Sequence, residues 1–130
     1  HMSNKSRGSN AERDLIHKFW SRKWAAMRSA GSGSSQFPAP DLVAGNNVRK
    51  LAIEVKLTTE KKKYFTKKEI NELVYFCRNF GAEGWVGVKF FHQPWYFLTI
   101  EDLEETPKSY AVSVELAQLK GLTFEELVEL

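Results

Sequence analysis

The chain has little cysteine, little histidine and no long apolar run. Its single cysteine, Cys77, excludes an internal disulfide and a zinc site built from several cysteines. His1, His17 and His92 are too scattered to match the spacing of a metal-binding motif. No stretch is apolar enough over about 20 residues to span a bilayer, and no secretory signal is present. We therefore expect a cytoplasmic protein, associated with the nucleoid if it binds DNA.

The 130 residues predict one domain with a modest apolar core. His1 and Met2 resemble the remnant of an expression tag. We expect residues 1–8 to be a flexible basic segment and residues 9–130 to form the domain.

Charge is divided unevenly along the chain. Residues 1–100 carry 17 basic and 8 acidic side chains, a net charge of +9, whereas residues 101–130 carry 2 and 8, a net charge of −6. A basic body of this kind favours a nucleic acid as partner over a membrane. The basic residues near the middle of the chain are Arg49, Lys50, Lys56, Lys61, Lys62, Lys63, Lys67 and Lys68.

Local patterns predict a mixed α/β sheet with helices packed on it. Two of the expected helices open on the capping-box patterns Ser9–Glu12 and Thr66–Glu69, and the second should end at Gly81. A third capping box, at Thr123, starts a short C-terminal helix. The expected elements are helices over about 10–23 and 67–80 and strands over 25–29, 41–45, 49–57, 84–91, 95–100 and 109–112.

Acidic residues and one lysine stand out around the second strand. Successive side chains of a strand point to opposite faces, so Glu54 and Lys56 share one face while alternating apolar residues share the other. Asp41 joins them if residues 41–45 and 49–57 form a hairpin. Carboxylate oxygens suit Mg²⁺, and the lysine suits a water or a phosphate oxygen. This arrangement indicates a metal-dependent phosphodiesterase.

Each of these residues also has a structural explanation. Glu12 fits a capping box, and Asp41 after Pro40 fits a turn. Glu54 and Lys56 could form an exposed ion pair. A carboxylate within an apolar strand needs a partner, however, and several charged groups converging on one edge favour a functional site.

The second helix has more apolar surface than one sheet contact needs. Phe76 and Phe80 lie beside its sheet-facing side at a spacing of four residues. This surplus predicts a symmetric protein–protein contact.

The motif of Glu12, Pro40-Asp41 and Glu54-Val55-Lys56 resembles that of the PD-(D/E)xK nuclease superfamily. This motif and the segments 28–32, 40–45, 76–81 and 86–90 follow one another in an order that resembles the archaeal Holliday junction resolvases. The resemblance implies a restriction-endonuclease-like single domain with a mixed central sheet flanked by helices. It also implies a homodimeric endodeoxyribonuclease that makes paired symmetric nicks in four-way DNA junctions during recombination and repair.

The resemblance also assigns roles by position. It implies Mg²⁺ as the cofactor, with Mn²⁺ able to replace it. Some members of the family carry a C-terminal peptide that docks on the sliding clamp, but residues 125–130 contain no clear version of it. The implied residues are Glu12, Asp41 and Glu54 as metal ligands, Lys56 and Ser32 as further catalytic residues, Arg13, Arg28, Lys61, Lys62, Lys63, Lys67, Lys68 and Lys89 for DNA binding, and Phe76 and Phe80 for the dimer contact.

Two other functions fit the same residues. One is a related nuclease that acts on flaps, nicks or mismatches. The other is a DNA-binding module that keeps the fold without catalysis, although no acid or lysine of the motif is lost here.

Overall fold

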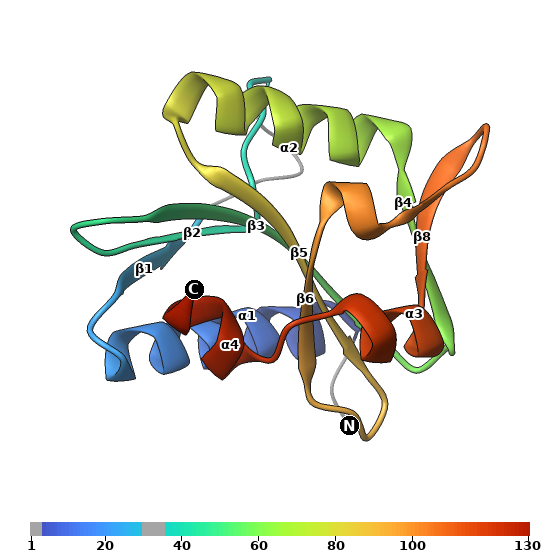
Figure 1. The fold of residues 1–130 in the computed structure, drawn as a ribbon, viewed down its shortest axis with the longest axis horizontal. Coiled ribbons are helices and arrows are strands. Elements are labelled where there is room, and N and C mark those ends of the chain that lie inside the picture. The colour runs from blue at the N-terminus through green and yellow to red at the C-terminus, as the bar shows by residue number, and fades with distance from the viewer. Residues whose placement is uncertain (1–3, 30–35) are drawn as a thin grey trace.

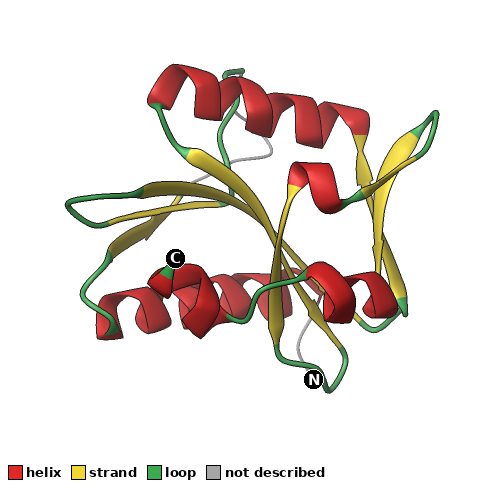
Figure 2. Ribbon diagram, viewed as in Figure 1, coloured by secondary structure: helices red, strands yellow, loops and turns green. Residues whose placement is uncertain are grey.

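The computed structural model describes residues 4–29 and 36–130, in which a five-stranded sheet lies between two layers of helices (Figure 1). Helix α2 (Lys67–Phe80) covers one face, and α1 (Asn4–Ser21) and α4 (Phe124–Glu129) cover the other (Figure 2). No described helix combines the length and the apolar character needed to cross a membrane.

Strands of mixed direction form the central sheet, as predicted. Its order is β1-β2-β3-β5-β6, with β3 parallel to β5 and the other neighbours antiparallel. A second, antiparallel sheet has the order β4-β8-β7. The remaining bounds are β1 (Ala25–Arg28), β2 (Leu42–Gly45), β3 (Lys50–Thr58), β4 (Lys62–Thr66), β5 (Glu83–Phe90), β6 (Trp95–Thr99), the 3-10 helix η1 (Ile100–Asp102), β7 (Glu104–Glu105), β8 (Ser109–Ser113) and α3 (Val114–Lys120).

Each face of the central sheet has its own apolar core. Leu51 and Ile53 of β3 are fully buried in a cluster that includes Phe19 of α1. Ala52 points to the other face, where it belongs to a cluster with Ile70 of α2. Because the two faces are both covered, this part of β3 is apolar at every position.

The cover thins toward the end of β3. Glu54 and Lys56 are half-buried on the α2 side, and Val55 is buried on the α1 side. Leu57, the last of the alternating apolar residues of this strand, is 38% exposed and does not belong to that cluster. The charged pair therefore stands where the buried part of the strand ends.

The predicted start of the first helix is wrong. Helix α1 begins at Asn4 instead of Asn10. Ser9 and Glu12 lie inside the helix and do not form a capping box, and both side chains accept hydrogen bonds from Arg28 of β1. Residues 4–8 of the segment expected to be flexible belong to α1.

The other helix ends follow their local signals. Thr66 and Thr123 each form a complete capping box, and Gly81 ends α2 with a φ of 78°. The lysine-rich stretch after β3, which we did not expect to be a strand, contains β4, because Phe65 within it is fully buried.

The two edges of the central sheet differ in their contacts. At β6, Phe97 and Leu122 exchange backbone hydrogen bonds of 2.9 and 2.8 Å. At β1, the indole nitrogen of Trp20 donates to the carbonyl oxygen of Ala26 at 3.0 Å.

Candidate active site

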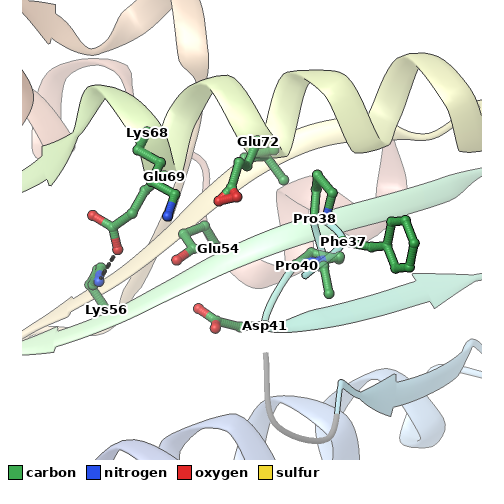
Figure 3. Close-up of a pocket in the computed structure, with 11 residues that line it drawn as sticks. Phe37, Pro38, Pro40, Asp41, Glu54, Lys56, Lys68, Glu69 and Glu72 are labelled. Carbon is green, nitrogen blue, oxygen red and sulfur yellow. Dashed lines mark hydrogen bonds and ion pairs between the residues drawn. The ribbon is translucent and has the colours of Figure 1, made fainter. Parts of the chain in front are cut away.

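Asp41 lies just before β2 and faces β3. The last residue pair of the two strands joins Leu42 to Ile53, and Asp41 Oδ2 accepts a hydrogen bond from the backbone nitrogen of Val55 at 2.7 Å. The side chain thus adds one bond beyond the ladder. It is held beside Glu54, as the hairpin prediction required (Figure 3).

The environment raises the pKa of Glu54 from 4.5 to about 8. Burial is the largest cause, followed by the negative charge of Asp41, and the nearby Lys56 only partly offsets them. The charge of Glu69 and a hydrogen bond with Asp41 raise the pKa further. Near neutral pH, Asp41 and Glu54 together therefore favour one negative charge over two.

Lys56 is paired with α2 and not with its neighbour on the strand. Its Nζ lies 2.7 Å from Glu69 Oε2, and both side chains are about a quarter exposed, at 25% and 29%. Burial alone lowers the pKa of Lys56, but the hydrogen bond to Glu69 and the surrounding carboxylates raise it above its ordinary value. Burial likewise raises the pKa of Glu69, but bonds from Lys56 and Thr66 outweigh it and lower the pKa. Both groups are therefore charged at neutral pH.

Glu12 is held by an arginine. Arg28 Nε donates to Glu12 Oε1 at 3.0 Å, and Arg28 Nη2 donates to the Ser9 hydroxyl at 3.3 Å. Burial raises the pKa of Glu12, Arg28 opposes this effect, and the charge of Asp41 adds to it. Glu12 is therefore within electrostatic reach of Asp41 while its hydrogen bond goes to Arg28.

A cleft of about 320 Å³ contains the charged groups of β3 and α2. Residues 37–41 form one wall, and the first turns of α2 form the other (Figure 3). Glu69 and Glu72 line it beside Glu54 and Lys56. We did not predict these two acids as site residues, although their spacing of three residues places them on one face of the helix.

The donor set fits a hard divalent cation. Asp41 and Glu54 bring carboxylate oxygens together, and the negative charge of Asp41 adds to burial in raising the pKa of Glu54. Mg²⁺ binds through one or two carboxylates and keeps several waters. Within residues 4–29 and 36–130, no three acidic, histidine or cysteine side chains converge closely enough to hold a metal ion. Glu12, predicted as the third ligand, forms an ion pair with Arg28 at 3.0 Å.

The remaining predicted residues lie on several elements. Lys89 Nζ donates to the carbonyl oxygen of Gln93 at 2.7 Å and so closes the β5–β6 turn. Arg13 is exposed on α1 and donates to Asn10 Oδ1 at 3.3 Å. Ser32 lies outside the described residues.

Acidic residues of β7 pair with some of the predicted DNA-binding lysines. Lys62 lies 3.0 Å from Glu104, and Lys67 lies 2.7 Å from Glu105. Lys67 also stands over the ring of Tyr110, 4.4 Å from its centroid. Lys61 and Lys68 are exposed and Lys63 is half-buried.

The aromatic pair of α2 remains partly uncovered. The rings of Phe76 and Phe80 lie 5.2 Å apart, and Phe80 is 48% exposed. Tyr75 on the same helix is 60% exposed. Ile70 and Leu73 of the same helix are buried.

Comparison with known proteins places this geometry in context. The family model described as archaeal Holliday junction resolvase (Hjc) matches residues 3–130. The chain is 43% identical to the crossover junction endodeoxyribonuclease Hjc of Archaeoglobus fulgidus, over 94% of this chain and 95% of that protein. It is 33% identical to the protein of the same name from Sulfurisphaera tokodaii, over 97% and 88%. The solved structure of Archaeoglobus fulgidus Hjc superposes with a TM-score of 0.87 at 42% identity, covering 92% of this chain and 97% of that one.

Proposed function

Because the chain belongs to the archaeal Holliday junction resolvase family, we propose that it is a metal-dependent endonuclease that resolves four-way DNA junctions. The observation that carries the catalytic part is the pairing of Asp41 and Glu54 at the open end of β3. Two carboxylates that resist ionising together are suited to bind a divalent cation.

Asp41 and Glu54 would hold the metal, for which Mg²⁺ is the proposed ion and Mn²⁺ a substitute. The bound ion supplies a water of lowered pKa and neutralises charge on the phosphate. Glu12 would complete the ligand set once Arg28 turns from it to a DNA phosphate. Ser32, which lies outside the described residues, is proposed as a further catalytic residue because the chain belongs to this family.

Lys56 would act directly on the reacting groups. Its ammonium group lies at the same cleft as the two carboxylates and is charged at neutral pH. It can orient the attacking water and offset the negative charge that develops on the phosphate oxygens. Lys56 is therefore proposed as a catalytic residue.

Junction selectivity would come from a symmetric dimer. The exposed ring of Phe80 and the partly buried ring of Phe76 beside it on α2 support a contact between two copies, which would present two clefts at a fixed separation. Phosphate contacts carry no sequence information, so base sequence should matter little for binding. Arg13, Lys61, Lys63, Lys68 and Lys89 are proposed to contribute to these contacts together with Arg28, Lys62 and Lys67.

The test is a magnesium-dependent cleavage assay on a synthetic four-way junction, with nicks mapped on both strands. Linear duplex and flap DNA of the same sequence serve as comparison substrates. We expect paired symmetric nicks in the junction and slower cleavage of the other two. Equal rates on all three would remove the junction preference and favour a repair nuclease of this fold.

The catalytic assignment is tested in the same assay. Replacing a residue that only orients a metal ligand typically lowers metal affinity or activity about 10–100-fold. Because Glu54 is itself a proposed ligand, Glu54→Gln should reduce the cleavage rate by at least about a hundredfold. The matched control is Glu125→Gln, which makes the same change at an exposed position of α4. Cleavage by Glu54→Gln at the parental rate would point to a non-catalytic DNA-binding module and a contaminating nuclease.

A further inference from the structure

Glu69 makes more contacts than a capping residue needs. Its Oε1 accepts from the backbone nitrogen of Thr66 at 2.9 Å, and its own backbone nitrogen donates to the Thr66 hydroxyl at 3.0 Å. These bonds complete the capping box and fix the side chain at the start of α2. The second oxygen, Oε2, is directed at Lys56 Nζ on β3, 2.7 Å away.

The lysine has other acceptors within electrostatic reach. Glu54 lies two residues before Lys56 on the same face of β3, and the charges of Glu54 and Asp41 both act on the ammonium group. A lysine head is a compact charge on a flexible stem, so it can turn between neighbouring carboxylates. An ammonium group placed between Asp41 and Glu54 would occupy the position of the metal ion.

We propose that Glu69 is a positioning residue that holds the Lys56 ammonium group on the α2 side of the cleft and so leaves Asp41 and Glu54 available to a divalent cation. This inference rests on the proposed function, because it concerns the same carboxylate pair. Figure 3 shows the arrangement: the Lys56–Glu69 ion pair lies at one side of the cleft, with Glu54 and Asp41 beside it. Because the capping box fixes the Glu69 side chain, its Oε2 atom can restrain the Lys56 ammonium group.

The chain contains a matched control for this residue. Thr123 and Glu126 of α4 form the same capping box, with bonds of 2.9 and 3.1 Å. Glu126 is exposed and lies on a different helix from the cleft residues. Glu126→Gln therefore reproduces the effect of Glu69→Gln on a helix start without the lysine contact.

The first experiment measures Mn²⁺ binding to the protein without DNA by titration calorimetry, because Mn²⁺ suits carboxylate ligands. Glu69→Gln should weaken binding by at least about tenfold, the usual effect of removing a partner that orients a metal site. Glu126→Gln should bind Mn²⁺ as the parent does. Unchanged Mn²⁺ binding in Glu69→Gln would overturn the proposal.

A double-mutant cycle separates positioning from a simple charge effect. If Glu69 acts by restraining Lys56, the loss caused by Glu69→Gln should nearly disappear in a Lys56→Gln background. If the loss persists in full, Glu69 acts only through its own negative charge, and the positioning role is wrong. A parent protein that binds no Mn²⁺, either alone or in complex with junction DNA, would instead refute the metal-dependent function itself, whereas a failure to prefer junctions would leave this inference intact.

Discussion

The backbone nitrogen of Val55 donates to Asp41 Oδ2 at 2.7 Å, so a proposed metal ligand also supports the fold. The bond lies just past the last pair of the β2–β3 ladder, where no residue of β2 remains to accept it. Substitutions at Asp41 should therefore change stability and metal binding together, and the two effects have to be separated.

Two variants of Asp41 make that separation. Asp41→Asn keeps an oxygen acceptor for Val55, whereas Asp41→Ala leaves the buried backbone donor without one. Both relieve the repulsion with Glu54 to a similar degree. We expect the alanine variant to be less stable than the asparagine variant by about 1–3 kcal/mol, and both to lose cleavage. Urea unfolding at fixed pH measures the difference, and equal stabilities would mean that the bond contributes nothing.

Stability without metal should depend on the protonation of Glu54. The folded pKa is raised from 4.5 to about 8, so between these values the folded state binds more protons than the unfolded state. The contribution of Glu54 to stability is then lost as pH rises through this window. Thermal unfolding in EDTA should give a melting temperature that falls with pH, relative to Glu54→Gln, from about pH 5 to pH 8.

Added Mg²⁺ provides the control for this pH effect. Since the ion favours the ionised carboxylates, it should raise the melting temperature of the parent more at pH 8 than at pH 5. Glu54→Gln should lose most of that gain. Parallel pH curves for the parent and the variant in EDTA would contradict the shifted pKa.

If α2 forms the dimer contact, substitution of Phe80 should weaken dimerisation. Phe80→Ser removes an exposed aromatic ring from the proposed contact, and we expect dimer affinity to fall by at least about tenfold. Leu119→Ser is the matched control, because Leu119 is 78% exposed on α3. Light scattering over a concentration series measures both. A parent that stays monomeric at all concentrations would refute the dimer.

The acidic strand β7 should weaken DNA binding. Glu104 and Glu105 form ion pairs with Lys62 and Lys67. To bind DNA, the two lysines must exchange these partners for phosphates. Exposed ion pairs are weak, so changing both acids to glutamine should tighten junction binding only about two- to fivefold at low salt. The gain should shrink as salt rises, because screening reduces both interactions. Fluorescence anisotropy, with Glu125→Gln as control, tests this; weaker binding of the double variant would contradict it.

Local patterns were sufficient to predict much of this fold. The hairpin around Asn46, the cap at Thr66 and the stop at Gly81 each depend on a few adjacent residues, and the structure has all three. The neighbourhood of Asp41 and Glu54 followed from the hairpin register. The predicted start of α1 was wrong because Ser9 and Glu12, which match a capping-box pattern, do not bond to each other. Both accept hydrogen bonds from Arg28, which is distant in sequence.

The part of the site that could not be predicted depends on contacts between elements. The Lys56–Glu69 pair needs the exact placement of α2 over β3, which β4 sets by joining the second sheet. No periodicity within either segment encodes that placement. The same holds for Glu12 and Arg28, whose pairing depends on how α1 lies against β1.

The contacts at the two sheet edges bear on solubility. An uncovered edge strand can recruit strands from other molecules and so start aggregation. Leu122 occupies a donor and an acceptor of β6, and the Trp20 indole occupies an acceptor of β1. Trp20→Phe would remove that obstruction while keeping an aromatic ring, and the chain would then be more prone to form intermolecular β-structure when concentrated.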